Sequence, residues 1–118
     1  MKSVKYVKKE EAVIRGEGSS YVISNYITRD YSDKVSVAVS ELSGNAPKTV
    51  NLVSDRIYYF IEGDAEFIFD DKVIKIEKDA TLFIPAKTEY KMIGSFKAVL
   101  VNAPAFSFLD EKHLEVLA

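Results

Sequence analysis

The chemistry of this sequence centres on one arginine and the tyrosines near it. Arg56 and Tyr58 stand two residues apart in the segment RIYYFI, and strand alternation would place both on one face. A guanidinium can hold a carboxylate or phosphate through two parallel hydrogen bonds. A phenol such as Tyr58 or Tyr90 could serve as a proton donor, or as an acid/base group if Arg56 lowered its pKa. These residue types predict anion binding, with proton transfer as a second hypothesis.

Thiol chemistry is excluded by composition, because the chain has no cysteine. Disulfides, zinc–thiolate sites, iron–sulfur clusters and cysteine nucleophiles all require one. The chain has one histidine, His113, which falls in a segment that we expect to be a C-terminal helix. A mononuclear catalytic metal needs about three protein ligands, commonly imidazoles and a carboxylate. We therefore expect no metal and no other cofactor, with His113 facing solvent.

The overall composition is that of an ordinary globular protein. The chain has 118 residues, of which 47% are apolar and 29% charged, and the formal charge is −2. This length predicts a single domain over residues 1–118. The charges are interspersed, which argues against a nucleic-acid partner. The start has no apolar run of signal-peptide length, and no stretch would span a membrane, so we expect a cytoplasmic protein.

Period-two alternation of apolar and polar residues dominates the sequence and predicts short β-strands. The segments are SYVISNYITRDY, KVSVAVSEL, RIYYFI, AEFIFD, KVIKIE, ATLFIP, EYKMI and FKAVLVN. Glycine-containing pairs between or beside them predict turns at Gly44-Asn45, Gly63-Asp64 and Gly94-Ser95. Eight or more strands at this spacing predict a sandwich or a barrel.

The last residues, 107–118, look helical instead. Ser107 or Asp110 could cap this short helix. Three leucines could then pack it against the barrel: Leu109, Leu114 and Leu117.

Two segments carry a family resemblance, RIYYFIEGDAEF and IEKDATLFIPAKTEY. In this order, about twenty residues apart, they resemble the two motifs of the cupin superfamily, and the similar region runs over residues 49–103. The resemblance implies an all-β, single-domain, cupin-like jelly-roll β-barrel or sandwich. The pattern of residues 107–118 adds a short C-terminal helix to this fold.

The cupin metal-ligand positions carry other residues in this chain. The resemblance places Arg56 where cupins have a glutamate and Tyr90 where they have the third histidine. The histidine pair falls on Thr49 and Asn51, or on Val50 and Leu52 if the gap is one residue shorter. An arginine keeps its proton and has no acceptor, so it cannot bind a metal. The resemblance thus implies a metal-free cupin-like protein.

The former ligand positions would then line an aromatic pocket inside the barrel. The residues that we expect to bind a ligand are Arg56, Asn51, Thr49, Tyr58, Tyr90 and Met92. Arg56 should have a partner, because a buried unpaired guanidinium is costly. The partner is either the anionic group of a ligand or an internal acid. Asp55 is adjacent but should point to the other face, and the other possible partners are Glu62, Glu66 and Glu89.

Three functions remain open from the sequence. The first is binding of a small, anionic molecule in the barrel, which we favour over catalysis. The second is a metal-independent isomerase, epimerase or lyase acting on a small acid or sugar derivative, with Tyr58 and Tyr90 as the catalytic candidates. The third is a barrel filled by its own side chains, such as Phe60, Phe67, Phe69, Phe83 and Met92. In each case exposed sheet edges give a motive for a homodimer.

Overall fold

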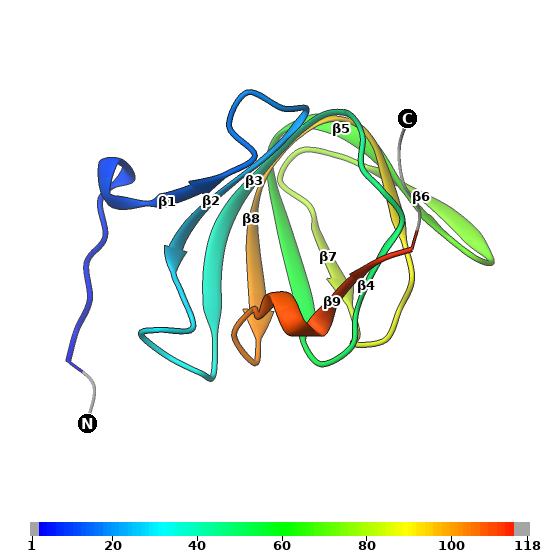
Figure 1. Ribbon diagram of the computed structural model, residues 1–118. Coiled ribbons are helices and arrows are strands. Elements are labelled where there is room, and N and C mark those ends of the chain that lie inside the picture. Colours follow the sequence, from blue (N-terminus) through cyan, green and yellow to red (C-terminus); the bar gives the residue numbers. More distant parts are fainter. Residues whose placement is uncertain (1–2, 115–118) are drawn as a thin grey trace.

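The computed structural model describes residues 3–114, and these residues fold as a β-barrel with very little helix (Figure 1). The strands are β1 (Val13–Arg15), β2 (Tyr21–Ile27), β3 (Ser36–Asn45), β4 (Thr49–Asn51), β5 (Asp55–Phe69), β6 (Lys72–Ile76), β7 (Thr81–Ile84), β8 (Lys91–Ala103) and β9 (Glu111–His113). Two 3₁₀ turns, η1 (Lys9–Glu11) and η2 (Phe108–Asp110), complete the elements. The expectation of an all-β fold is confirmed.

The strands form one large sheet and one small one, with antiparallel pairing throughout. The large sheet has the order β1-β2-β3-β8-β5-β6, and β7 pairs with the first half of β5. The small sheet joins β4 to β9. Figure 1 shows the large sheet curling around an interior, with β4 and β9 crossing the front of it. The two sheets are not joined into a closed ring by ladder hydrogen bonds, so the barrel has a mouth.

Three predicted glycine turns are wrong. Gly44-Asn45 forms the paired end of β3, and β5 and β8 continue through Gly63-Asp64 and Gly94-Ser95 as long, bent strands. The ladder of β5 on β8 shifts register between Phe60 and Glu62, which marks a β-bulge. Gly63 and Gly94 lie beside this bulge with φ of +87° and +138°. At Gly94 an added Cβ would lie 2.7 Å from the Cα of Ala65, so only glycine fits the approach of the two strands. These glycines bend the sheet and do not reverse the chain.

One half of the barrel interior is packed solid with aromatic side chains. As the alternation predicts, Arg56, Tyr58 and Phe60 are buried while their neighbours along β5 are exposed. Tyr58 contacts Phe67 edge to face with centroids 5.1 Å apart, and Phe60 contacts Phe96 in the same way at 5.4 Å. Offset and edge contacts of this kind add stability beyond the apolar area that they bury.

The C-terminal segment, residues 104–114, crosses the barrel mouth and is called the strap. It is less helical than expected. Its helix is the single turn η2, where the Ser107 hydroxyl accepts from the Leu109 amide at 3.3 Å, as the capping prediction required. The chain then enters β9, so His113 lies on a strand and not on a helix. Leu109 is 85% exposed and does not pack on the barrel. The expected contact of Leu117 lies outside the described residues.

The outer face of β5 and β7 exposes apolar side chains. Ile57, Tyr59 and Phe83 are each about half exposed there, and Phe83 lies opposite Ile57 in the ladder. Phe83 therefore does not fill the barrel. The homodimer expected from the sequence stays a prediction. In the part of the chain that the structure describes, no helix is long and apolar enough to cross a membrane.

Candidate functional site

Arg56, the second residue of β5, lies at the centre of a buried hydrogen-bond network. Its Nη1 donates to the Tyr90 hydroxyl at 2.7 Å, and its Nε donates to Oδ1 of Asn102 at 3.2 Å. The Tyr90 hydroxyl lies 3.0 Å from that of Tyr58, which also contacts the Met92 sulfur at 3.8 Å. The Arg56 guanidinium is thus linked, directly or through one hydroxyl, to Asn102, Tyr90 and Tyr58.

The internal partner of Arg56 is Glu111 on β9, an acid that the sequence analysis did not consider. Nη2 of Arg56 lies 2.6 Å from Oε1 of Glu111, and the Arg56 side chain is only 4% exposed. The Asn51 amide nitrogen donates to the same oxygen at 3.0 Å. Thr49 lies within reach too, with its hydroxyl 3.3 Å from Oε2. The strap is therefore fastened to the barrel through a desolvated ion pair.

The sequence did not indicate Glu111 as the partner of Arg56, because we expected its segment to be a helix. The alternation of EKH, with Glu111 and His113 on one side and Lys112 on the other, was the available signal. A three-residue strand is too short for periodicity to settle its type. Only the pairing of β9 with β4 places Glu111 beside Arg56.

The electrostatics of the network keep Arg56 charged and Tyr58 neutral. Burial alone would lower the pKa of Arg56, but nearby Tyr90, Tyr58 and Glu111 raise it, and the net shift is upward. Burial raises the pKa of Tyr58 well above its ordinary value, and the opposing effect of Arg56 does not reverse this. Tyr58 is thus poorly suited to act as a tyrosinate base near neutral pH.

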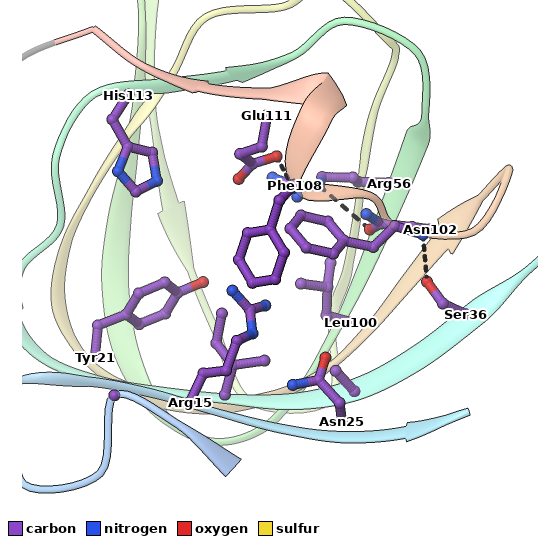
Figure 2. Close-up of a pocket in the computed structure, with 14 residues that line it drawn as sticks. Arg15, Tyr21, Asn25, Ser36, Arg56, Leu100, Asn102, Phe108, Glu111 and His113 are labelled. Atoms are coloured by element: carbon purple, nitrogen blue, oxygen red, sulfur yellow. Dashed lines mark hydrogen bonds and ion pairs between the residues drawn. The ribbon is translucent and has the colours of Figure 1, made fainter. Parts of the chain in front are cut away.

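An open cavity of about 440 Å³ lies on the other side of Arg56 (Figure 2). This volume is within the range of ordinary small-molecule sites. Its apolar walls come from β2, β3, β8 and the strap: Ile23, Ala38, Leu100, Phe106 and Phe108. Its polar walls are formed by Arg15, Tyr21, Asn25, Ser36, Arg56, Asn102, Glu111 and His113.

Arg15 at the end of β1 is the second guanidinium of the cavity. Its guanidinium carbon lies 4.5 Å from the centroid of the Phe108 ring and 4.9 Å from that of Phe106, in cation–π contact with both. Half-burial lowers the pKa of Arg15, although an arginine remains protonated near neutral pH. Among the described residues no carboxylate forms an ion pair with Arg15. The rings hold this cation without neutralising it.

Asn102 and His113 supply further polar groups. Asn102 is 2% exposed, and its Nδ2 has no hydrogen-bond partner among the described residues. Its Oδ1 is already bound to Arg56, so the amide presents a donor to the cavity. In Figure 2, His113 and Tyr21 lie across the cavity from Phe108. The side chain of Glu111 extends from the strap toward Arg56. His113, which we had expected to face solvent on a helix, lines the cavity instead.

The structure divides the six sequence-predicted binding residues into two groups. Arg56 alone lines the cavity. The other five belong to the buried network or to its surroundings in the packed half: Thr49, Asn51, Tyr58, Tyr90 and Met92. The structure does bring all six together, but as a filled layer behind Arg56. Their role in ligand binding, and that of Tyr58 and Tyr90 in catalysis, stays a prediction.

The donor set does not fit a metal ion. The positions that the cupin resemblance assigns to ligands hold a guanidinium, a phenol, an amide and a hydroxyl, and these groups hydrogen-bond to one another or to Glu111. A cation there would face the positive charge of Arg56. Over residues 3–114 no group of three or more histidine, aspartate or glutamate side chains could hold a metal. The absence of a metal cofactor remains a prediction that metal analysis can test.

Comparison with known proteins supports the fold and leaves the function open. No family model matches the chain. An uncharacterized protein of Methanocaldococcus jannaschii, MJ1618, is 25% identical over 114 residues, which cover 93% of this chain and 87% of that protein. Among solved structures, Pac13 of Streptomyces with bound uridine superposes with a TM-score of 0.87 at 20% identity, covering 98% of this chain and 94% of its own. Pac13 is described as a nucleoside dehydratase.

A second solved structure extends the likeness to larger proteins. Oxalate decarboxylase of Bacillus subtilis matches with a TM-score of 0.82 at 15% identity over 97% of this chain, which corresponds to 32% of the enzyme. Both solved structures have the cupin fold, as the resemblance of residues 49–103 implied. This chain thus has the cupin fold. Its interior has an arginine-centred network in place of the usual metal-ligand set.

Proposed function

We propose that this protein binds a small anionic molecule in the cavity between Arg15 and Arg56. The observation that carries the proposal is the charge balance of the site. Two guanidiniums face the cavity, while Glu111 is the one carboxylate among its described lining residues. Glu111 is already paired with Arg56, so the positive charge of Arg15 is left for a ligand. Buried or half-buried charges are normally paired, and an anion would complete the set.

Two further features support this reading. The unpartnered Nδ2 of Asn102 is a buried donor, and such groups are costly unless something accepts from them. The cavity also combines apolar and aromatic walls with a few convergent polar groups, which is how small-molecule sites are commonly built. That the similar Pac13 structure holds uridine fits a ligand of this size.

The test is a thermal-shift and calorimetric screen of small phosphates and carboxylates against the wild type and two variants. Arg15→Gln removes the unpaired cation of the cavity, and Lys112→Gln removes a cation from the other face of the same mouth as a matched control. A ligand at one hundred times its Kd should stabilise the wild type by about 2.7 kcal/mol. We expect Arg15→Gln to abolish the shift and Lys112→Gln to keep it. An unchanged shift in Arg15→Gln would contradict the proposal, and metal analysis of the same sample would test the predicted absence of a metal.

A second candidate function, a metal-independent lyase, is favoured by the position of His113. Imidazole is a common general base in enzymes. His113 would take a proton from the carbon next to a carbonyl of the bound acid. The electron pair of that carbon–hydrogen bond would form a carbon–carbon double bond as the carbon–oxygen bond at the neighbouring carbon breaks. The imidazolium could then protonate the departing hydroxyl, so that water leaves and the base is regenerated.

This second function predicts exchange of one ligand carbon-bound proton for deuterium in D₂O, followed by NMR. His113→Gln should lose the exchange but still bind the ligand measurably, because Arg15 is untouched. Equal exchange rates in the wild type and the variant would exclude His113 as the base. Binding with no exchange in the wild type would leave the binding function alone.

A further inference from the structure

We infer that the ligand of this cavity carries a planar ring directly beside its anionic group. The inference rests on the proposed function and specifies the class of molecule bound. It is drawn from three features of the cavity: the aromatic groups that flank it, the way in which Arg15 is held, and the free donor of Asn102.

Rings flank the cavity from two sides. Phe108 on the strap is 67% exposed although it lies beside the cavity, so part of its ring stays accessible even with Arg15 against it. Across the cavity are the rings of Tyr21 and His113 (Figure 2). A planar group between these rings could stack on both sides, and such stacking contributes substantially to the binding of nucleobases and similar rings.

The anion-binding group lies against the same rings. The guanidinium carbon of Arg15 lies close to both Phe108 and Phe106, whose centroids are 5.2 Å apart. A guanidinium in cation–π contact can still donate its N–H groups to a carboxylate or phosphate. An anion held by Arg15 would therefore lie next to the ring-binding space. A ligand with only an anionic group would leave the aromatic surface unused.

Asn102 adds a requirement for an acceptor. Arg56 Nε donates to the amide oxygen of Asn102, so the other end of the amide is the NH2 group, which can only donate. A carbonyl on the ring, or an anionic oxygen close to it, would satisfy this buried donor. The combination predicts a planar ring with polar substituents and one negatively charged group, as in a nucleoside monophosphate or a heterocyclic carboxylate.

The experiment compares matched probes by isothermal titration calorimetry. Uridine 5′-monophosphate is paired with ribose 5-phosphate, which lacks the ring, and orotate is paired with dihydroorotate, whose ring is not planar. We expect at least one planar probe to bind about tenfold more tightly than its partner, the effect of one good stacking contact. Phe108→Leu should remove most of this difference, whereas Phe83→Leu, which changes a comparably exposed ring on the outer face of β7, should keep it.

The outcomes separate this inference from the proposed function. If both members of each pair bind with equal Kd, or if Phe108→Leu leaves the difference intact, the ring inference is overturned while anion binding stands. If no phosphate or carboxylate of the screen binds, including these four probes, both fail. Tight binding of uridine itself that Arg15→Gln does not weaken would overturn both the proposed anion site and the inference, because uridine carries no negative charge.

Discussion

The two halves of the barrel interior meet at Arg56 and differ in almost every physical respect. Behind Arg56, the aromatic side chains of β5 and β8 fill the space and satisfy one another, and Tyr58 and Phe67 have no exposed surface. In front of it, the walls enclose about 440 Å³ of open cavity, with an unpaired guanidinium and an unpartnered amide. One half stabilises the fold, and the other has the features of a site.

This difference teaches that the chemistry of side chains does not by itself locate a site. Tyrosines, an arginine and an amide occur in both halves. In the packed half their hydrogen-bonding groups find protein partners, which removes them from competition for a ligand. In the open half Arg15 and Asn102 retain unused capacity. The candidate binding residues are those whose charge or hydrogen-bonding requirements the protein leaves unmet.

The largest expected effect would come from removing a ring of the packed half. Phe67→Ala should lower the free energy of unfolding by about 4 kcal/mol, because it deletes a fully buried ring and leaves a cavity that its neighbours cannot fill. Urea denaturation measures this loss. Phe108→Ala, at the open half, should change stability by less than about 1 kcal/mol. Similar losses in the two variants would break the distinction between the halves.

A smaller effect is expected at the ion pair that separates them. Glu111→Ala leaves Arg56 buried without its carboxylate and should cost about 3 kcal/mol in urea denaturation. Glu41→Ala is the matched control, since Glu41 pairs with Lys97 at 3.6 Å with both side chains partly exposed. Such surface pairs contribute about 1 kcal/mol at most. Equal costs for the two variants would show that the strap is not held by Arg56.

The smallest effect is the alkaline dependence of stability from Tyr58. Burial raises its pKa above 10 in the folded protein, while an unfolded tyrosine ionises near 10. The folded state therefore binds more protons above pH 10, and its stability, complete below that pH, falls as pH rises further. The loss should approach about 1.4 kcal/mol per pH unit for this group.

Urea unfolding at pH 8 and pH 11 would measure that dependence. Tyr58→Phe should lose less stability between the two pH values than the wild type does. Tyr21, whose pKa burial also raises, would retain part of the slope in the variant. Tyr6→Phe, which changes an 80% exposed ring, should behave as the wild type. An unaltered slope in Tyr58→Phe would mean that Tyr58 is not buried as a neutral phenol.

The fold was largely predictable because its determinants are local and repeated. The alternation along RIYYFI correctly assigned Arg56, Tyr58 and Phe60 to the interior, and the two cupin-like motifs indicated the barrel. The errors concern glycine and the C-terminus. Gly63 has the same backbone freedom in a turn and in a bulge, so the sequence could not distinguish a chain reversal from a bend in β5. The segment EKH was too short to reveal its strand.

The site was predictable only at Arg56. The sequence by itself determined that the interior would be aromatic, that an arginine would lie within it, and that this arginine would need a partner. Tertiary structure alone decided that the partner is Glu111, that Tyr58 and Tyr90 are enclosed, and that Arg15, Asn102 and His113 line an open space. The physical reason is that inward orientation follows from the two-residue period of a strand. Whether space remains in front of a side chain depends on strands distant in sequence, here β1, β8 and β9, and on how they pack.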